Sequence, residues 1–79
     1  MSFNIYPNPT TDKLNIDIVN INGDAVISVL DNLGRTLYDD KISAAQKHKI
    51  IDVSNLAKGT YYVRLYQNSD SIIRQFIKQ

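Results

Sequence analysis

Turn-forming residues divide this chain at intervals of about 8 to 12 residues, the spacing typical of the strands in a small β-sandwich or barrel. The dividing signals include Pro7-Asn8-Pro9, Asn22-Gly23 and Asp31-Asn32-Leu33-Gly34. The stretches between them are short and rich in β-branched and aromatic residues, which favour strands. We therefore expect about seven strands, at residues 3–6, 13–18, 25–30, 35–41, 47–53, 60–66 and 71–78.

The composition supports an all-β chain. All eight acidic residues are Asp and eight Asn accompany them, and both types favour turns through side-chain bonds to nearby backbone. Eleven Ile, five Val, five Tyr and four Thr favour strands. With 79 residues and no cysteine, we expect a single domain spanning residues 1–79, held by its core without disulfides.

Turn chemistry predicts how several strands are joined. Asn22-Gly23 can take positive φ, which predicts a hairpin turn after the alternating strand at residues 13–18. Asp31 and Gly34 occupy the outer positions favoured in a type I turn. Ser43-Ala44-Ala45-Gln46 has the form of a capping box, but the β-branched run that follows leaves too little room for a helix, so we expect a loop.

The two prolines place the first strand at an edge. Pro7 and Pro9 remove two backbone donors, and a segment of this kind is tolerated only at the edge of a sheet. We expect residues 7–9 to be extended and unpaired.

Seven antiparallel strands in a chain of this size fit an immunoglobulin-like β-sandwich better than a closed barrel. In Gly59-Thr60-Tyr61-Tyr62-Val63, the first tyrosine lies two residues after a glycine and two before an inward apolar position. This spacing is that of a tyrosine corner, in which the hydroxyl bonds to backbone. The alternative is that Tyr61 simply fills the core.

The last two strands predict a surface for contact with a partner. If Tyr61, Val63 and Leu65 point inward, alternation places Tyr62, Arg64 and Tyr66 outward. For the final strand, avoiding burial of a cation places Ile73, Gln75 and Ile77 inward. The outward face would then carry the aromatic and basic side chains Tyr62, Arg64, Tyr66, Arg74, Phe76 and Lys78.

The sequence contains few residues suited to catalysis. His48 could serve Ser43 or Ser54 as a base, but nothing in the spacing brings them together, and no nucleophile elbow is present. Asp31 and the cluster Asn20-Asn22-Asp24 lack the long loop and terminal bidentate acid of a calcium site. We expect no enzyme activity, no cofactor and no metal.

Charge and hydropathy narrow the possible partners. Apolar runs such as Ala25-Val26-Ile27 are far shorter than the roughly 18 residues of a membrane helix, so we expect no membrane insertion. The net charge is only +1, which argues against nucleic acid. Residues 1–40 are acidic and 41–79 basic, but interleaved strands would mix these charges in space.

Three blocks of sequence together resemble a known family. They are Tyr6-Pro7-Asn8-Pro9 followed by Leu14-Asn15-Ile16, then Leu30-Asp31-Asn32-Leu33-Gly34-Arg35, then the run from Ile51 to Val63. The chain then ends in a short strand with a terminal cation, Lys78. In this order they resemble the type A C-terminal sorting domain of the type IX secretion system of Bacteroidetes, over nearly the whole chain.

The resemblance implies a non-catalytic export signal with an immunoglobulin-like fold. Its partners would be an outer-membrane translocon, a shuttle protein and a sortase-like peptidase. The parent protein would pass through the periplasm to the cell surface or the medium, and the domain would commonly be cleaved off. The absence of a signal sequence fits a segment taken from a longer secreted protein, with Met1 supplied by expression.

A translocon that serves many cargoes could add a strand to an open sheet edge, since main-chain bonds need no fixed side-chain sequence. Two edges are candidates, that of the proline-interrupted first strand and that of the last strand. The resemblance favours the last strand, since the family depends on its final residues, and an open edge could also pair two copies of the domain. The expected recognition residues are Tyr6, Pro7, Asn8, Pro9, Gly34, Gly59, Tyr61, Ile73, Phe76, Ile77 and Lys78.

Two alternatives stay open. Gly59 could be required only for a turn, the prolines only to end a strand, and Lys78 only for solubility. The face formed by Tyr62, Arg64, Tyr66 and Arg74 could instead stack on sugars, as in a carbohydrate-binding or adhesive module.

Overall fold

The computed structural model describes residues 1–79. It contains seven β-strands and no helix. They are β1 (Ser2–Tyr6), β2 (Lys13–Val19), β3 (Ala25–Leu30), β4 (Thr36–Ile42), β5 (His48–Asp52), β6 (Gly59–Gln67) and β7 (Asp70–Lys78). Each lies within about two residues of its predicted position. None of these elements is a helix with the length and hydropathy needed to cross a membrane.

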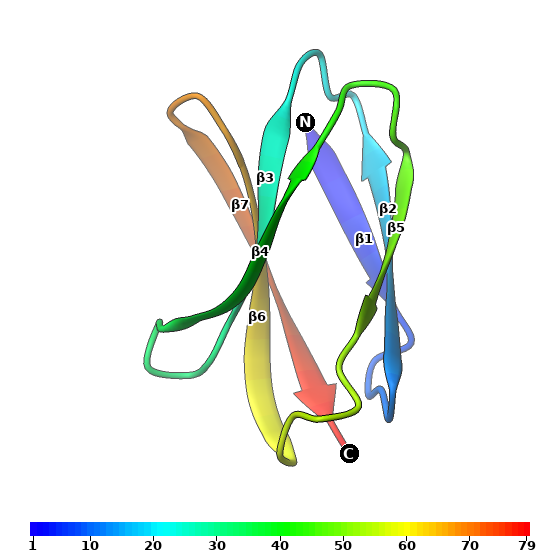
Figure 1. Ribbon diagram of the computed structural model, residues 1–79, viewed down its shortest axis with the longest axis vertical. Helices are drawn as coiled ribbons and strands as arrows, with labels where there is room; N and C mark the ends of the chain where they lie inside the picture. Colours follow the sequence, from blue (N-terminus) through cyan, green and yellow to red (C-terminus); the bar gives the residue numbers. More distant parts are fainter.

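The strands form two antiparallel sheets that face each other (Figure 1). One sheet has the order β1-β2-β5 and the other the order β4-β3-β6-β7. This division, in which strands from both halves of the sequence interleave, confirms the predicted sandwich of seven strands. The first strand lies at an edge of its sheet, as its prolines predicted.

The predicted hairpin at Asn22-Gly23 is wrong. Here the chain crosses from β2 in one sheet to β3 in the other, and positive φ occurs at Asn20 (φ 60°) instead. The reason is that both strands are central: β2 already pairs with β1 and β5, and β3 with β4 and β6. Neither has an edge free to pair with the other.

The predicted turn between β3 and β4 is present and is organised by Asp31. The Gly34 N–H donates to the Asp31 carbonyl at 3.0 Å, and Gly34 has a φ of +83°, which favours glycine. The Asp31 carboxylate accepts bonds from the N–H groups of Leu33 and Arg35 and from the Arg35 guanidinium. These bonds, first of all that from the Arg35 N–H, lower the pKa of Asp31.

The hydrophobic core lies between the two sheets. Alternation along β2 sends Leu14, Ile16 and Ile18 inward, as predicted, and β6 does the same with Val63 and Leu65. The thirteen clustered core residues are Phe3, Leu14, Ile16, Ile18, Ala25, Ile27, Val29, Ile42, Ile51, Val53, Val63, Leu65 and Phe76.

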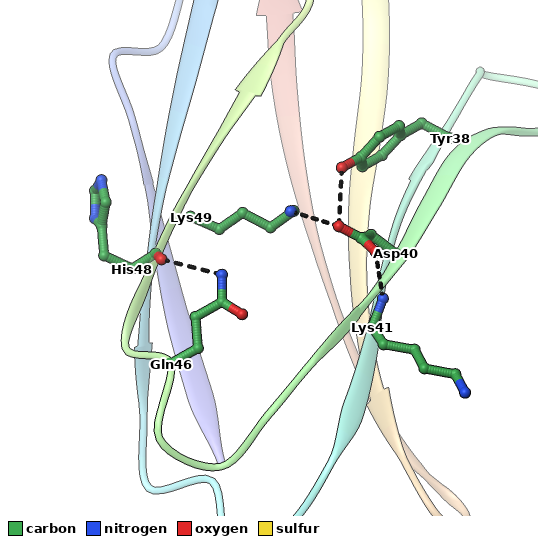
Figure 2. A network of polar contacts seen from close by, with 6 residues as sticks. All are labelled: Tyr38, Asp40, Lys41, Gln46, His48 and Lys49. Atoms are coloured by element: carbon green, nitrogen blue, oxygen red, sulfur yellow. Dashed lines mark hydrogen bonds and ion pairs between the residues drawn. The ribbon is translucent and has the colours of Figure 1, made fainter.

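An ion pair joins the two sheets on the open side between β4 and β5 (Figure 2). Lys49 on β5 donates to the Asp40 carboxylate on β4 at 2.7 Å, and the Lys49 side chain is only 13% exposed. The Lys49 hydrogen bond lowers the pKa of Asp40, and that same bond raises the pKa of Lys49. The acidic and basic halves of the sequence are thus mixed in space, as interleaved strands predicted.

Candidate functional site

The inward face of β7 is the opposite of the one we predicted. Phe76 is fully buried and Lys78 is 7% exposed, whereas Ile73 and Ile77 are exposed. In the pairing with β6, Phe76 lies opposite Tyr61 and Arg74 opposite Val63, on the face that looks toward the other sheet. The outward side chains of β7 are therefore those of Ile73, Gln75 and Ile77. The side chains on the face toward the other sheet are those of Arg74, Phe76 and Lys78.

The prediction failed because it assumed that an inward cation must be buried. At the sheet edge, Arg74 stays exposed while its guanidinium lies 5.5 Å from the centre of the Phe3 ring. Lys78 buries its stem and donates to the Gln79 carbonyl at 3.2 Å. Phe76 gains the core and stacks on Tyr61 with ring centres 5.6 Å apart.

The segment Pro7-Asn8-Pro9 lies along the outer edge of β7. Its backbone joins no strand ladder, as predicted, but the side chain of Asn8 bonds to the β7 backbone. The Asn8 side chain accepts from the Ile77 N–H at 2.9 Å and donates to the Gln75 carbonyl at 3.1 Å. Thr10, the next residue after Pro9, continues this contact: its N–H donates to the Ile77 carbonyl, and its carbonyl accepts from the Gln79 N–H. This role was not predicted from the sequence. The Asn8 side chain carries both an amide donor and a carbonyl acceptor, the two groups that an edge strand leaves unpaired.

Part of the β7 edge stays open. Gln75 and Ile77 turn their backbone groups away from β6, so by alternation Ser71 and Ile73 do the same. No strand pairs with β7 on this side. Among the outward backbone groups of Ser71 and Ile73, the Ile73 carbonyl accepts a bond from the Arg74 guanidinium at 3.4 Å. The edge is closed by Asn8 and Thr10 near its end and accessible between residues 71 and 75.

The tyrosine corner is present. The Tyr61 hydroxyl donates to the Ala57 carbonyl at 2.7 Å, and its half-buried ring packs against the core. Gly59 opens β6 with a φ of +155°, a value that residues with side chains rarely adopt. Tyr61 and Gly59 thus shape the loop before β6 and the start of the strand that pairs with β7.

Tyr6 lies apart from these residues. It ends β1, the residue is 45% exposed, and its carbonyl accepts from the Asn15 side chain at 3.2 Å. Partial desolvation, followed by the neighbouring Asp17 carboxylate, raises the pKa of the Tyr6 hydroxyl.

The alternative contact face is smaller than predicted. Tyr62, Arg64 and Tyr66 do share the outward side of β6, with the Arg64 guanidinium 5.3 Å from the centre of the Tyr66 ring. The neighbours that β7 adds are Ile73 and Gln75 rather than Arg74 and Phe76. The face is therefore mixed aliphatic and aromatic, with one cation from these two strands.

The candidate base His48 is engaged elsewhere. Its Nδ1 lies 2.5 Å from the Asp17 carboxylate on the neighbouring strand, and Ser43 and Ser54 are not among its partners. His48 is the largest cause of the lowered pKa of Asp17. No group of three or more His, Cys, Asp or Glu side chains is placed to hold a metal ion.

Comparison with known proteins identifies the kind of domain. The family model of the secretion system C-terminal sorting domain matches residues 4–79. The chain is also 30% identical over 71 residues to a protein of Nonlabens ulvanivorans named ulvan lyase NLR42. The matched segment covers 90% of this chain but only 13% of that relative.

Proposed function

The chain belongs to the family of secretion system C-terminal sorting domains. We propose that residues 1–79 act as a single export signal that can be moved from one cargo protein to another. The domain is a type IX secretion signal, and it directs export to the cell surface or the extracellular space. The match over residues 4–79 is the observation that carries this function, because it spans both sheets and all the sequence blocks described above.

The cargo would precede residue 1 in a longer protein. The relative named as an ulvan lyase supports this arrangement, because the present chain corresponds to only 13% of it. The sorting family is a non-catalytic signal. Any catalytic activity of the parent protein would belong to the cargo.

The specific partners we propose are an outer-membrane translocon, a shuttle protein and a sortase-like peptidase. The parent protein would reach them from the periplasm, and the domain would be removed after export. The apolar core of thirteen residues supports this route, since a folded domain resists proteolysis in transit.

We further propose that the outward side of β7 is the recognised element. Ile73 and Ile77 are 51% and 40% exposed, and the edge between residues 71 and 75 is open to strand addition. Phe76 and Lys78 would support this strand from inside the sandwich. The remaining expected residues, Tyr6, Pro7, Asn8, Pro9, Gly34, Gly59 and Tyr61, would act by holding the strand and its neighbours in place.

The first experiment fuses residues 1–79 to a signal-bearing fluorescent reporter in a bacterium with a type IX system. Fluorescence at the surface and in the medium is compared with that of a translocon-deficient strain. We expect export only in the competent strain. Retention in the periplasm of both strains would reduce the family match to a shared fold and would favour the sugar-binding alternative.

The recognised element needs a gentler test than truncation, because removing residues 73–79 also removes Phe76 from the core. Replacing Ile73 and Ile77 by Lys changes only exposed positions of β7. The matched control is Ile50→Lys, at a position that is 55% exposed on the other sheet. Loss of export in the double variant, with an unchanged melting temperature and a normal control, is the expected result; normal export of the double variant would exclude this face.

A further inference from the structure

A cleft of about 380 Å³ lies at one end of the sandwich, between the β3–β4 turn and the β5–β6 loop. Both connections lie at the same end of the molecule, in the lower half of Figure 1. The lining residues belong to two of the three sequence blocks that resemble the sorting family, residues 30–35 and 51–63, with Leu37 beside them. These blocks, separate in sequence, thus build a single concave surface.

The charges around this cleft favour an anionic group. Arg35, whose side chain is 73% exposed, uses its Nε to bond Asp31, and its two terminal nitrogens have no partner in the structure. Lys58 is exposed and makes no ion pair or side-chain hydrogen bond. The Asp31 carboxylate is already occupied by the turn. The groups free to meet a ligand are therefore cationic.

The backbone of the cleft offers bonds to an extended peptide. The pairing of β3 with β6 ends at Leu30 and Tyr62, so residues 59–61 of β6 continue past the end of β3. Tyr61 of β6 lies opposite Phe76 of β7, and the backbone N–H and C=O groups of these two residues face each other. By alternation, Thr60 turns its N–H and C=O to the side where β3 has ended. A strand placed there would complete the sheet.

Apolar side chains extend the cleft toward the open side of the sandwich. Leu37, which is 45% exposed, and Leu56 line it and also line a second cleft of about 160 Å³ between β4 and β5. Six of the eight residues around that second cleft are hydrophobic. An apolar side chain of a ligand could bury itself there while its neighbour meets the cations.

We propose that this cleft binds an extended peptide segment of a partner protein. An acidic side chain of that segment meets Arg35 and Lys58, its backbone pairs with Thr60, and an apolar side chain packs against Leu37 and Leu56. The assignment of the partner to the type IX machinery rests on the proposed function, whereas the binding chemistry does not. The site is distinct from the exposed side of β7.

Three blocked heptapeptides test the chemistry. Each alternates Thr and Val, and the central residue is Glu, Gln or Lys. Titration into the isotope-labelled chain is followed by amide chemical shifts. We expect the Glu peptide to bind most tightly and the Lys peptide least, with the largest shifts at Thr60 and its neighbours in the cleft. Shifts confined to β7, or equal affinity for all three peptides, would overturn the proposal.

Lys58→Glu is the decisive variant, because Lys58 makes no contact on which the fold depends. It should weaken the Glu peptide about two- to fivefold and strengthen the Lys peptide, as expected for one exposed charge pair. Lys47→Glu, the same charge change in the exposed loop at the other end of β5, should leave both affinities unchanged. An equal effect of the two variants would show that net charge, and not the cleft, decides binding.

The export reporter separates this inference from the proposed function. We expect the reporter carrying Lys58→Glu to be exported less than the wild type, while the Lys47→Glu reporter is exported normally. If the wild-type reporter fails to leave the cell, the proposed function fails and the peptide titration still decides the cleft. If the wild type is exported and Lys58→Glu is exported equally well, the cleft has no part in sorting.

Discussion

Replacing Asn8 by Ala tests whether a single side chain holds the edge of the last strand. The change removes the acceptor of the Ile77 N–H and the donor to the Gln75 carbonyl, with distances of 2.9 and 3.1 Å. The pairing of Thr10 with Ile77 and Gln79 stays, because it uses backbone groups only. The variant thus loses two hydrogen bonds and little apolar contact, since Asn8 is exposed.

A side-chain hydrogen bond contributes about 0.5 to 1.5 kcal/mol net, and both of these bonds are solvent-exposed. We expect Asn8→Ala to lower the free energy of unfolding by about 1 to 2 kcal/mol. For a domain of this size, that loss corresponds to a drop in melting temperature of roughly 4 to 16 °C. The Ile77 amide should also exchange its hydrogen faster, because its partner is gone.

Thermal unfolding followed by circular dichroism, with amide exchange measured by NMR, checks both expectations. Asn4→Ala is the matched control, since Asn4 is exposed on β1 and its side chain makes no hydrogen bond. Equal melting temperatures of the two variants and unchanged exchange at Ile77 would refute the role given to Asn8.

Three further predictions follow from the same contacts. Tyr61→Phe should cost on the order of 1 kcal/mol, because only the hydroxyl bond to backbone is lost, and an unchanged denaturation midpoint would remove the tyrosine corner. Phe76→Ala should cost about 3 to 5 kcal/mol, so loss of export must coincide with loss of the folded domain, as circular dichroism would reveal. Bonds from Ser54, followed by that from Lys13, lower the pKa of Asp52 to about 2. Its contribution to stability is therefore complete above the unfolded-state pKa of about 3.9 and is lost as the pH falls toward 2. The melting temperature should drop over this interval, and by less in Asp52→Asn, whereas equal acid sensitivity would contradict the assignment.

The sequence was sufficient to predict the strands and several local features. Alternation in β2 and β6, the Asp31 to Gly34 turn and the Tyr61 corner depend on residues close together in the chain, so their signals are local. The face of β7 was not predictable in this way, since Ile72 and Phe76 alternate toward one side while Ile73 and Ile77 alternate toward the other. The arrangement with Phe76 inward is possible because Arg74 lies at a sheet edge, where its cation stays in water.

Long-range contacts account for the other differences. Asn22-Gly23 permits a reversal of the chain but contains no information on which sheet the next strand joins. Asn8 and Ile77 are 69 residues apart, and the cleft joins two loops whose proximity depends on the sandwich. Neither arrangement has a sequence period that could have revealed it.

The contact of residues 8–10 with β7 has a consequence for biosynthesis. Residues 8–10 emerge from the ribosome well before their partners on β7. β6 also lacks its outer neighbour until then, and Phe76 is missing from the core. A prematurely terminated chain therefore cannot assemble the domain. Presentation of the folded sorting domain therefore requires synthesis to continue through β7.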